Sequence, residues 1–247
     1  MPDVSKKINA MRHAGALLAQ TFDSVSEAIS EGMSAFSLDQ HIREFIETNG
    51  AIPGFLNYQG YQYSSCISKN EEIVHGIPHP DKIFFDGDIV SVDIGIKYNG
   101  YYVDAARTFL IGDVSDELRH LTEVTQAAFF HCLVGIKAGS RLGDISNGIQ
   151  SYVESNGLTV VKDLYSHGIG SNLHEDPLIP NYGKKGVGIK LYDGMTMAIE
   201  PMVNLGVAGI HTLDDKWTIV TEDRKWSAHY ENTILIKDDG VEILTIH

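Results

Sequence analysis

The sequence has few cysteines, no long apolar run and no cluster of basic residues. Its 247 residues include only two cysteines, Cys66 and Cys132, which excludes a disulfide framework and suits a reducing compartment. No apolar run approaches the roughly 18 residues of a membrane-spanning helix. The N-terminal stretch MPDVSKKINAMRHAGALLAQ also lacks the apolar core of a signal peptide. These absences predict a cytoplasmic protein without a membrane anchor.

Basic residues are outnumbered by acidic ones, 19 against 33, which gives a formal net charge of −14. A surface that binds phosphate backbones needs clustered Lys and Arg, so no direct nucleic-acid binding is expected. The acidic excess has two interpretations: it keeps the chain soluble, or it gathers carboxylates that hold cations. Hydrophobic residues make up 43% of the chain, which is enough to bury one sizeable core or two modest ones.

Two kinds of hydrophobic periodicity alternate along the chain. Steps of three and four predict helices over residues 5–30, from Ser37 to Gly50, and over residues 115–137 and 142–156. Short β-branched and aromatic runs bounded by Gly, Asn and Asp predict strands, namely ISKNEEIVHGI, DGDIVSVDIGIKYNGYYVDAARTFLIG, MTMAIEPMV and SAHYENTILIKDDGVEILTI. The pattern predicts an α+β protein.

An internal similarity links two distant segments. Residues 29–50 (ISEGMSAFSLDQHIREFIETNG) align with residues 136–157 (IKAGSRLGDISNGIQSYVESNG) at a constant offset of 107. Identical pairs are Ile29/Ile136, Gly32/Gly139, Ile42/Ile149, Glu47/Glu154, Asn49/Asn156 and Gly50/Gly157. We therefore expect one domain over residues 1–247, built from half-domain repeats at about 5–112 and 113–247, with a cleft at their junction.

The run IVSVDIGIKYNGYYVDAARTF predicts a hairpin that brings two carboxylates together. Asn99-Gly100 is a two-residue turn signal between alternating runs. This register places Asp93 opposite Ala106 and Asp104 opposite Gly95, so both carboxylates share one face as diagonal neighbours roughly 7–8 Å apart. Two buried like charges repel unless a cation lies between them. The hairpin therefore indicates a divalent metal site, or else a solvent-facing polar strand face.

Three further candidates lie in later segments. Glu200 sits in the apolar run MTMAIEPM, which Pro201 breaks, and Glu231 sits in AHYENTILI. His167 belongs to YSHGIGSNLHEDP, where His174 follows and glycines let the chain turn back. One imidazole and four carboxylates suit two divalent ions such as Co, Mn, Fe, Zn or Ni, and do not suit a thiolate-type structural zinc site.

At these motifs the sequence resembles the type I methionine aminopeptidases, which have the pita-bread fold. The resemblance extends from about Ile8 to Thr245 and includes CISKNEEIVHGIP, SHGIGSNLHEDP, MAIEPMV and AHYENT in order. It implies two pseudo-symmetric halves with an antiparallel sheet covered by helices. It also implies an enzyme that hydrolyses the N-terminal methionine from nascent proteins and peptides whose second residue is small.

The resemblance implies a role for each matching residue. Two divalent metal ions and a metal-bound hydroxide would be held by Asp93, Asp104, His167, Glu200 and Glu231, with Asp104 and Glu231 bridging. Glu200 would be the general base, and His75 and His174 would contact the substrate and the tetrahedral intermediate. The methionine pocket would be lined by Phe55, Tyr58, Tyr61, Cys66, Leu173 and Trp217.

Two residues depart from the family pattern. Ser166 stands where the family usually has Gly, and Asn232 stands where it usually has His. Neither change removes a ligand, but each alters the surroundings of one, so the metal preference and the pH optimum are open. His229 lies two residues before Glu231 on the same strand face, which leaves a role beside the ligands as an alternative to an ordinary buried histidine.

Other members of this fold are the main rivals. Proline-directed peptidases carry a large domain before the catalytic unit, whereas the first helix here begins close to Met1. Silent binding proteins and metal-free hydrolases of this fold lose ligands that this chain keeps. The resemblance further implies a monomer and leaves room for transient association with ribosomes.

Overall fold

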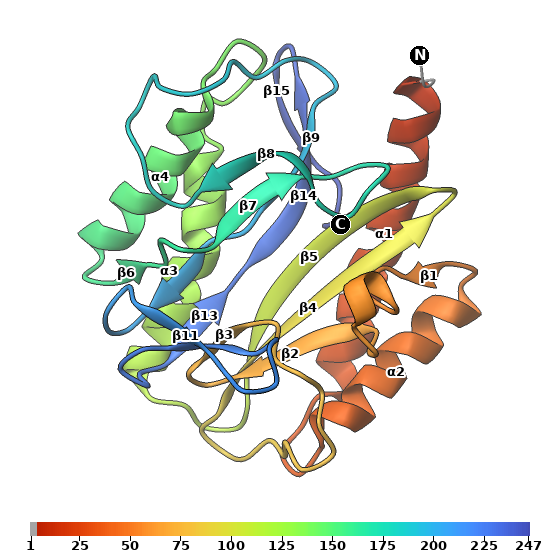
Figure 1. Cartoon of the computed structure of the whole chain (residues 1–247), viewed down its shortest axis with the longest axis vertical. Coiled ribbons are helices and arrows are strands. Elements are labelled where there is room, and N and C mark those ends of the chain that lie inside the picture. Colours follow the sequence, from red (N-terminus) through yellow and green to blue (C-terminus); the bar gives the residue numbers. More distant parts are fainter. Residues whose placement is uncertain (1–3) are drawn as a thin grey trace.

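The computed structural model describes residues 4–247 as a mixed structure of helices and strands (Figure 1). The helices are α1 (Val4–Ala28), α2 (Ala35–Thr48), α3 (Asp116–Cys132), α4 (Leu142–Ser155) and the short 3₁₀ helix η1 (Tyr58–Gly60). The first strands are β1 (Ile52–Pro53), β2 (Ser65–Lys69), β3 (Glu72–Val74), β4 (Ile89–Tyr98) and β5 (Tyr101–Leu110). The next are β6 (Thr159–Val160), β7 (Tyr165–Gly168), β8 (Glu175–Pro180), β9 (Thr196–Ile199) and β10 (Met202–Asn204). The last are β11 (Ile210–Thr212), β12 (Ile219–Thr221), β13 (Ser227–His229), β14 (Glu231–Lys237) and β15 (Gly240–Ile243).

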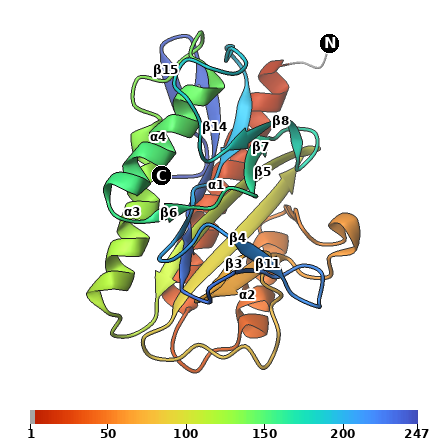
Figure 2. The same cartoon turned by 60° about the vertical axis from the view of Figure 1, so that its left-hand side comes forward.

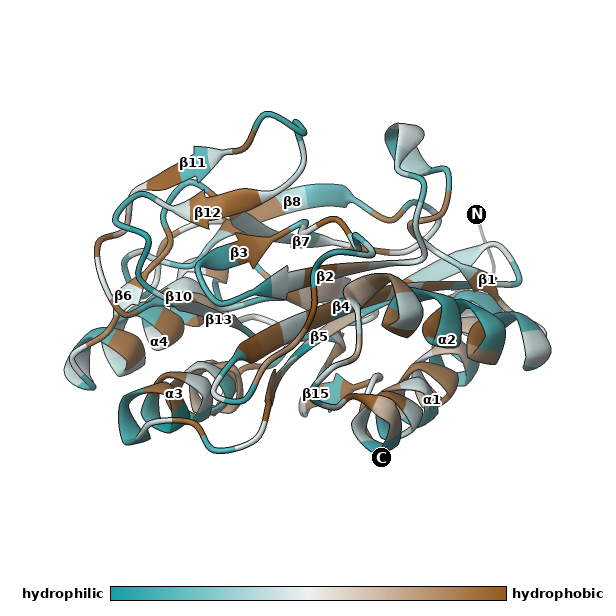
Figure 3. Cartoon of the chain, turned by 90° about the horizontal axis from the view of Figure 1, so that it is seen from below, coloured by the Kyte–Doolittle hydropathy of each residue, from teal (hydrophilic) through white to brown (hydrophobic). Residues whose placement is uncertain are grey.

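The strands form one large antiparallel sheet and two small ones. The large sheet has the order β1-β4-β5-β14-β9-β7-β8, with β2 added on β4 and β15 on β14. Figure 3 shows all four α-helices along one side of this sheet, with β3, β11 and β12 on the other side. The predicted α+β class, an antiparallel sheet covered by helices, is confirmed. None of the helices within residues 4–247 has the length and apolarity needed to cross a bilayer.

The helices follow the predicted periodicity, with two boundaries corrected. The helix expected over residues 115–137 ends at Cys132. α1 buries Met11 and Leu18 completely, as steps of three and four require. The second helix was expected to open at Ser37, but Ser34 is its N-cap, and the Ser34 Oγ accepts the Ser37 N–H at 3.1 Å. Both serines suit an N-cap, so local sequence did not separate them. Gly50 follows the helix with φ +78, as expected for a helix stop.

The central hairpin has the predicted register. β4 pairs with β5 so that Asp93 faces Ala106 and Gly95 faces Asp104. Asn99-Gly100 forms the loop, with φ of 49° and 88°, which are the positive values that a two-residue hairpin of this twist demands. β4 is buried along most of its length. The hairpin therefore carries both aspartates into the interior on one face.

Two helix pairs cover two hydrophobic clusters. α1 packs on α2 over one cluster, and α3 packs on α4 over the other (Figures 1 and 2). The first cluster includes Leu38 and Ile94, and the second includes Ile145 and Met197. The sheet runs through both, so the functional face is held from behind by two cores.

The two halves repeat the same local contacts at the offset seen in the sequence. Gly32 donates its N–H to the carbonyl of Phe84, and Gly139 donates to that of Leu191, both at 2.9 Å. Other contacts at this offset are Ala35 to Lys82, Leu142 to Ile189, Phe84 to Met33, Leu191 to Ser140, and the bridges Ser34–Ile83 and Arg141–Lys190. The half-domain boundaries stay a prediction, which these paired contacts support.

Candidate active site

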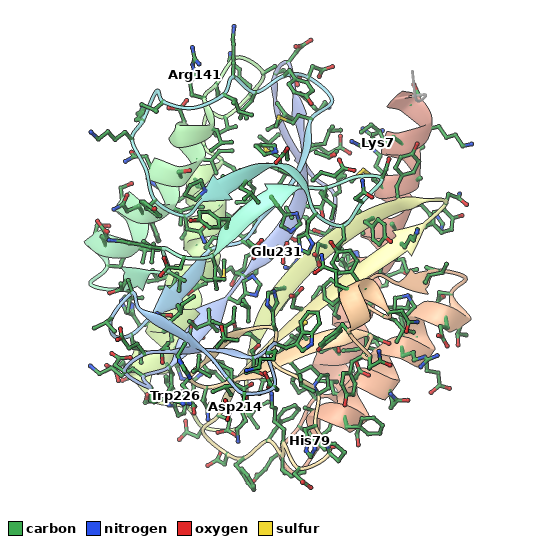
Figure 4. The ribbon with its side chains drawn as sticks, viewed as in Figure 1. Lys7, His79, Arg141, Asp214, Trp226 and Glu231 are labelled. Atoms are coloured by element: carbon green, nitrogen blue, oxygen red, sulfur yellow. The ribbon has the colours of Figure 1, made fainter. Side chains whose placement is uncertain are left out.

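A single cavity of about 290 Å³ brings the predicted residues together. It is lined by Asp93, Asp104, His167, Glu200, Glu231, His75, His174, Phe55, Tyr58, Tyr61, Cys66, Leu173 and Trp217. They come from segments spread over most of the sequence. Strands of the large sheet carry Cys66, Asp93, Asp104, His167 and Glu231, and the loops and short elements around that face supply the others. Figure 4 shows Glu231 near the middle of the sheet, far from the peripheral His79 and Arg141.

The carboxylates at the base of the cavity are buried and poorly satisfied. Asp93 Oδ1, Asp104 Oδ1 and Glu231 Oε1 have no hydrogen-bond partner among the described residues. Burial, together with the negative charge of Asp104, raises the pKa of Asp93, Glu200 and Glu231 well above the usual range. Burial raises the pKa of Asp104 to about 7. Acid groups this buried and this close need protons or cations to remain together.

One histidine faces these carboxylates in a defined tautomer. His167 Nδ1 lies 2.8 Å from the Gly168 carbonyl oxygen and donates to it, so Nε2 is left without a proton. That Nε2 lies 3.6 Å from Glu200 Oε1. Burial lowers the pKa of His167 to about 4, so the ring stays neutral near pH 7. A neutral imidazole with a free nitrogen beside carboxylates is a metal-ligand arrangement.

The donor set fits divalent cations. Ligand atoms of Asp104, His167 and Glu231 lie within 4.8 Å of one another, and so do those of Glu200, His229 and Glu231. Oxygen donors with a buried imidazole suit first-row divalent metals, and the unpartnered carboxylate oxygens supply free lone pairs. The residues present therefore fit the metal centre that the sequence predicted.

Ser166 holds the backbone of Glu200. The Glu200 N–H donates to Ser166 Oγ at 2.9 Å, and the amide of Asn181 donates to the Glu200 carbonyl at 3.0 Å. Glu200 lies between β9 and β10, next to Pro201, where no strand partner fixes it. The sequence identified Ser166 only as a departure from the family pattern, and in the structure its hydroxyl replaces a missing ladder hydrogen bond.

Asn232 is held by a partly buried arginine next to Glu231. Arg107 Nη2 donates to Asn232 Oδ1 at 2.6 Å, and Nη1 donates to the Glu231 carbonyl at 2.5 Å. Thr245 Oγ1 donates to the same Asn232 oxygen at 2.8 Å. The guanidinium stacks on Tyr230, with Cζ 4.4 Å from the ring centroid. Asn232 thus helps to fix the start of β14 without adding a titratable group.

The two histidines expected to contact the substrate, His75 and His174, also line the cavity. Tyr58 Oη lies 2.8 Å from His174 Nδ1, which leaves the other ring nitrogen of His174 for the cavity. The His174 ring is edge-on to His167, with centroids 4.4 Å apart. His75 has φ of 57°, a left-handed conformation that non-glycine residues adopt mainly at strained functional positions. Burial, and next the charge of His174, lowers the pKa of His75 to about 4.

The remaining lining is apolar and aromatic. The rings of Tyr61 and Trp217 are 4.9 Å apart, and Tyr61 Oη donates to the Ser65 carbonyl at 2.9 Å. Cys66 and Leu173 are buried. Burial, and next the charge of Asp93, raises the pKa of the Cys66 thiol well above its usual value. Cys66 therefore stays a neutral thiol, a small apolar wall rather than a thiolate ligand.

Some site residues were not predicted, and one glycine works differently from the expectation. The cavity is also lined by Gln59, Val74, Asp163, Leu164, Tyr165, Leu178 and Met202, several of which adjoin the motifs but carry no chemical signal of their own. Gly168 and Gly170 have no positive φ. A Cβ on Gly168 would lie 2.3 Å from the Asp176 carbonyl oxygen, so this glycine allows close strand approach rather than a turn.

Known proteins match this chain over nearly its whole length. The model of metallopeptidase family M24 matches residues 9–238. Methionine aminopeptidase of Clostridium perfringens is 48% identical over 240 residues, which cover 97% of this chain and 96% of the relative. Methionine aminopeptidase 1 of Bacillus subtilis is 46% identical over the same shares of both chains.

Solved structures show the same fold. The crystal structure of methionine aminopeptidase from Thermotoga maritima superposes with a TM-score of 0.96 at 43% identity, over 100% of this chain and 98% of that one. Prolidase from Pyrococcus furiosus gives a TM-score of 0.76 at 21% identity and covers 64% of that longer chain, which shows a shared fold alone. The predicted pita-bread fold is confirmed. The chain belongs to metallopeptidase family M24 and, within it, to the methionine aminopeptidases.

Proposed function

We propose that this chain removes the N-terminal methionine from peptides and nascent proteins whose second residue is small. In this proposal, two divalent metal ions are held by Asp93, Asp104, His167, Glu200 and Glu231. Such ions, when bound, acidify a water molecule and polarise a peptide carbonyl. The identity of the ions is not fixed by the donor set, which suits Co, Mn, Fe, Zn and Ni alike.

One observation carries this proposal: unsatisfied buried carboxylates share a cavity with an apolar aromatic wall. The carboxylates form the end of the cavity at which hydrolysis would occur. Tyr61, Trp217 and Phe55 provide a surface suited to a long, unbranched, polarizable side chain, because sulfur–aromatic contacts contribute about 0.3–1.5 kcal/mol. A peptide that enters with methionine against this wall has its first amide bond next to the carboxylates.

Glu200 is the residue proposed to carry the proton. Its Oε1 faces His167 and its Oε2 faces His229, so the carboxylate lies at the edge of the cluster and on the cavity wall. In the metal-free protein, burial and the charge of Asp104 raise its pKa. Bound cations would return the carboxylate to its ionised form, which is the form that accepts a proton. Glu200 accepts a proton from the attacking water and delivers it to the leaving amine.

His75 and His174 are proposed to hold the substrate carbonyl as its oxygen becomes negative. Both line the cavity, and burial lowers the pKa of each, so they act as neutral hydrogen-bond donors. Donors of this kind are worth about 2.7–4 kcal/mol each in comparable sites. Their loss should reduce the rate without removing the metal.

The wider setting follows from the same proposal. The chain would act as a cytoplasmic monomer on nascent polypeptides, with transient contact to ribosomes. Both cysteines are free and buried, which suits a reducing compartment.

A peptide assay tests the proposal. The protein is stripped with a chelator, reloaded with Mn²⁺ or Co²⁺, and given Met-Ala-Ser, Met-Trp-Ser and Ala-Pro-Ser. Metal-dependent release of methionine from Met-Ala-Ser, with little from the other two, supports the proposal. Cleavage of Ala-Pro-Ser alone indicates a proline-directed enzyme instead, and no turnover with any divalent metal indicates a binding protein.

A further inference from the structure

His229 is a buried histidine to which neither the family motifs nor the proposed reaction assigns a role. It ends β13, and its side chain is about 1% exposed. Neither Nδ1 nor Nε2 has a hydrogen-bond partner among the described residues. A buried imidazole without partners is unfavourable, so its retention at this position calls for a partner that the ring meets in the working enzyme.

The ring faces two of the proposed metal ligands. Its Nε2 lies 3.7 Å from Glu200 Oε2 and 3.8 Å from Glu231 Oε2. The cavity lining includes both glutamates but does not include His229. A substrate in the cavity would therefore meet Glu200 rather than the imidazole, so His229 can act only through its neighbours.

The backbones on both sides of this contact are already fixed. Thr108 Oγ1 accepts the His229 N–H at 3.1 Å and donates to the His229 carbonyl at 2.9 Å. Ser166 and Asn181 hold the peptide groups of Glu200. The remaining freedom at Glu200 is the orientation of its carboxylate, and the donors that face it decide that orientation.

The two oxygens of Glu200 face different partners. Oε1 lies toward His167, with which it would share a metal ion, and Oε2 lies toward His229. An ionised carboxylate that binds a cation through one oxygen gains from a donor at the other, because that hydrogen bond fixes both the rotation and the basicity of the group.

We propose that His229 is a positioning residue whose Nε2–H donates to Glu200 Oε2 and so orients the carboxylate that carries the proton. The proposal rests on the proposed role of Glu200. It makes Nδ1 the unprotonated nitrogen, and it places a second imidazole on the opposite side of Glu200 from His167.

Two variants separate a hydrogen-bond donor from simple packing. His229→Gln keeps an N–H at similar reach, whereas His229→Leu fills the space without a donor. The control is His79→Leu, an exposed histidine far from the site. If the His229→Leu protein does not fold, as judged by thermal unfolding, His229→Phe replaces it.

The first readout is steady-state cleavage of Met-Ala-Ser. We expect His229→Leu to lower kcat about 10- to 100-fold, the usual effect of losing a partner behind a metal ligand, with a smaller change in KM. His229→Gln should retain kcat within about threefold, and the control should match the parent protein. An unchanged kcat in His229→Leu would overturn the proposal.

The second readout is the visible absorption spectrum of the protein titrated with Co²⁺, which reports ligand geometry without requiring turnover. We expect the Gln variant to match the parent spectrum and the Leu variant to differ at the same Co²⁺ content. A Gln variant as impaired as the Leu variant would refute the donor role, because an imidazole itself would then be required. If the parent protein released no methionine, the proposed function would fail, and the spectra would still test His229.

Discussion

The metal-free protein should lose stability as the pH rises above about 6.5, because its site then buries ionised carboxylates without cations. Asp104 shows the size of the effect. Its pKa rises from the usual 3.8 to about 7 in the fold, and one pKa unit corresponds to about 1.36 kcal/mol. Between about pH 3.8 and 7 the folded state therefore holds a proton that the unfolded chain has released. Raising the pH across this whole window removes about 4 kcal/mol of stability through Asp104, of which about 1 kcal/mol is lost above pH 6.5.

The sign of this effect is clear only above the range in which histidines titrate. The pKa values of His75 and His167 are lowered to about 4, so below pH 6.5 the unfolded state binds more protons at these rings, which opposes the effect of the carboxyl groups. Above 6.5 the imidazoles are neutral in both states. The raised pKa values of Asp93, Glu200 and Glu231 then act in the same direction as that of Asp104. Each carboxyl still protonated contributes a fall of about 1.4 kcal/mol per pH unit.

Urea unfolding followed by circular dichroism between pH 6.5 and 8.5 measures this effect. Chelator-treated protein should become less stable over this interval, whereas Mn²⁺-loaded protein should not, because metal binding displaces the protons and strengthens with pH. At pH 8 the free energy of unfolding of metal-free Asp104→Asn should exceed that of the metal-free parent by up to about 4 kcal/mol, because the amide carries no charge to bury. A flat or rising curve for the metal-free parent, or a less stable Asn variant, would refute the reasoning.

Three further predictions concern single contacts. Tyr58→Phe removes the hydroxyl that fixes His174 and should lower kcat roughly twofold to tenfold, the worth of one hydrogen bond, with metal content by atomic absorption unchanged; a loss of metal would contradict this. Gly95→Ala places a Cβ 2.6 Å from the Phe55 ring and should raise KM for methionine peptides about 10-fold or more, as pocket misfits do, so an unchanged KM would count against a methionine pocket there. Asp39→Ala leaves three buried donors without their acceptor and should lower the free energy of unfolding by about 1–3 kcal/mol, with kcat at 25 °C as the control that stays constant.

The hairpin shows which parts of the site could be predicted from residues alone. An Asn-Gly turn between alternating runs fixes the register, and the register fixes the face of Asp93 and Asp104, because side chains alternate with a period of two. The structure confirms each of these steps. His167, Glu200 and Glu231 could be identified as candidates, but only the family register implied that they meet.

Other features lay beyond sequence reasoning because they depend on contacts between distant segments. Ser166 bonds to Glu200, and Arg107 bonds to Asn232, across the junctions of separate strands. No local sequence pattern predicts either contact. The N-cap at Ser34 was missed for a different reason, since Ser34 and Ser37, three residues apart, have equal N-cap propensity and tertiary contacts decide between them.

The paired contacts at the 107-residue offset bear on how the two halves of the protein are joined. At that offset, Asp93 in the first half corresponds to Glu200 in the second, so each half supplies carboxylates to the shared cavity. Each half has its own hydrophobic cluster. An ion held between the two sets of carboxylates would cross-link the halves, as a disulfide would in a secreted protein. Mutations that weaken the packing between the two halves should therefore lower the affinity for metal even when they lie far from any ligand. Metal titration would then report the stability of the contact between the halves.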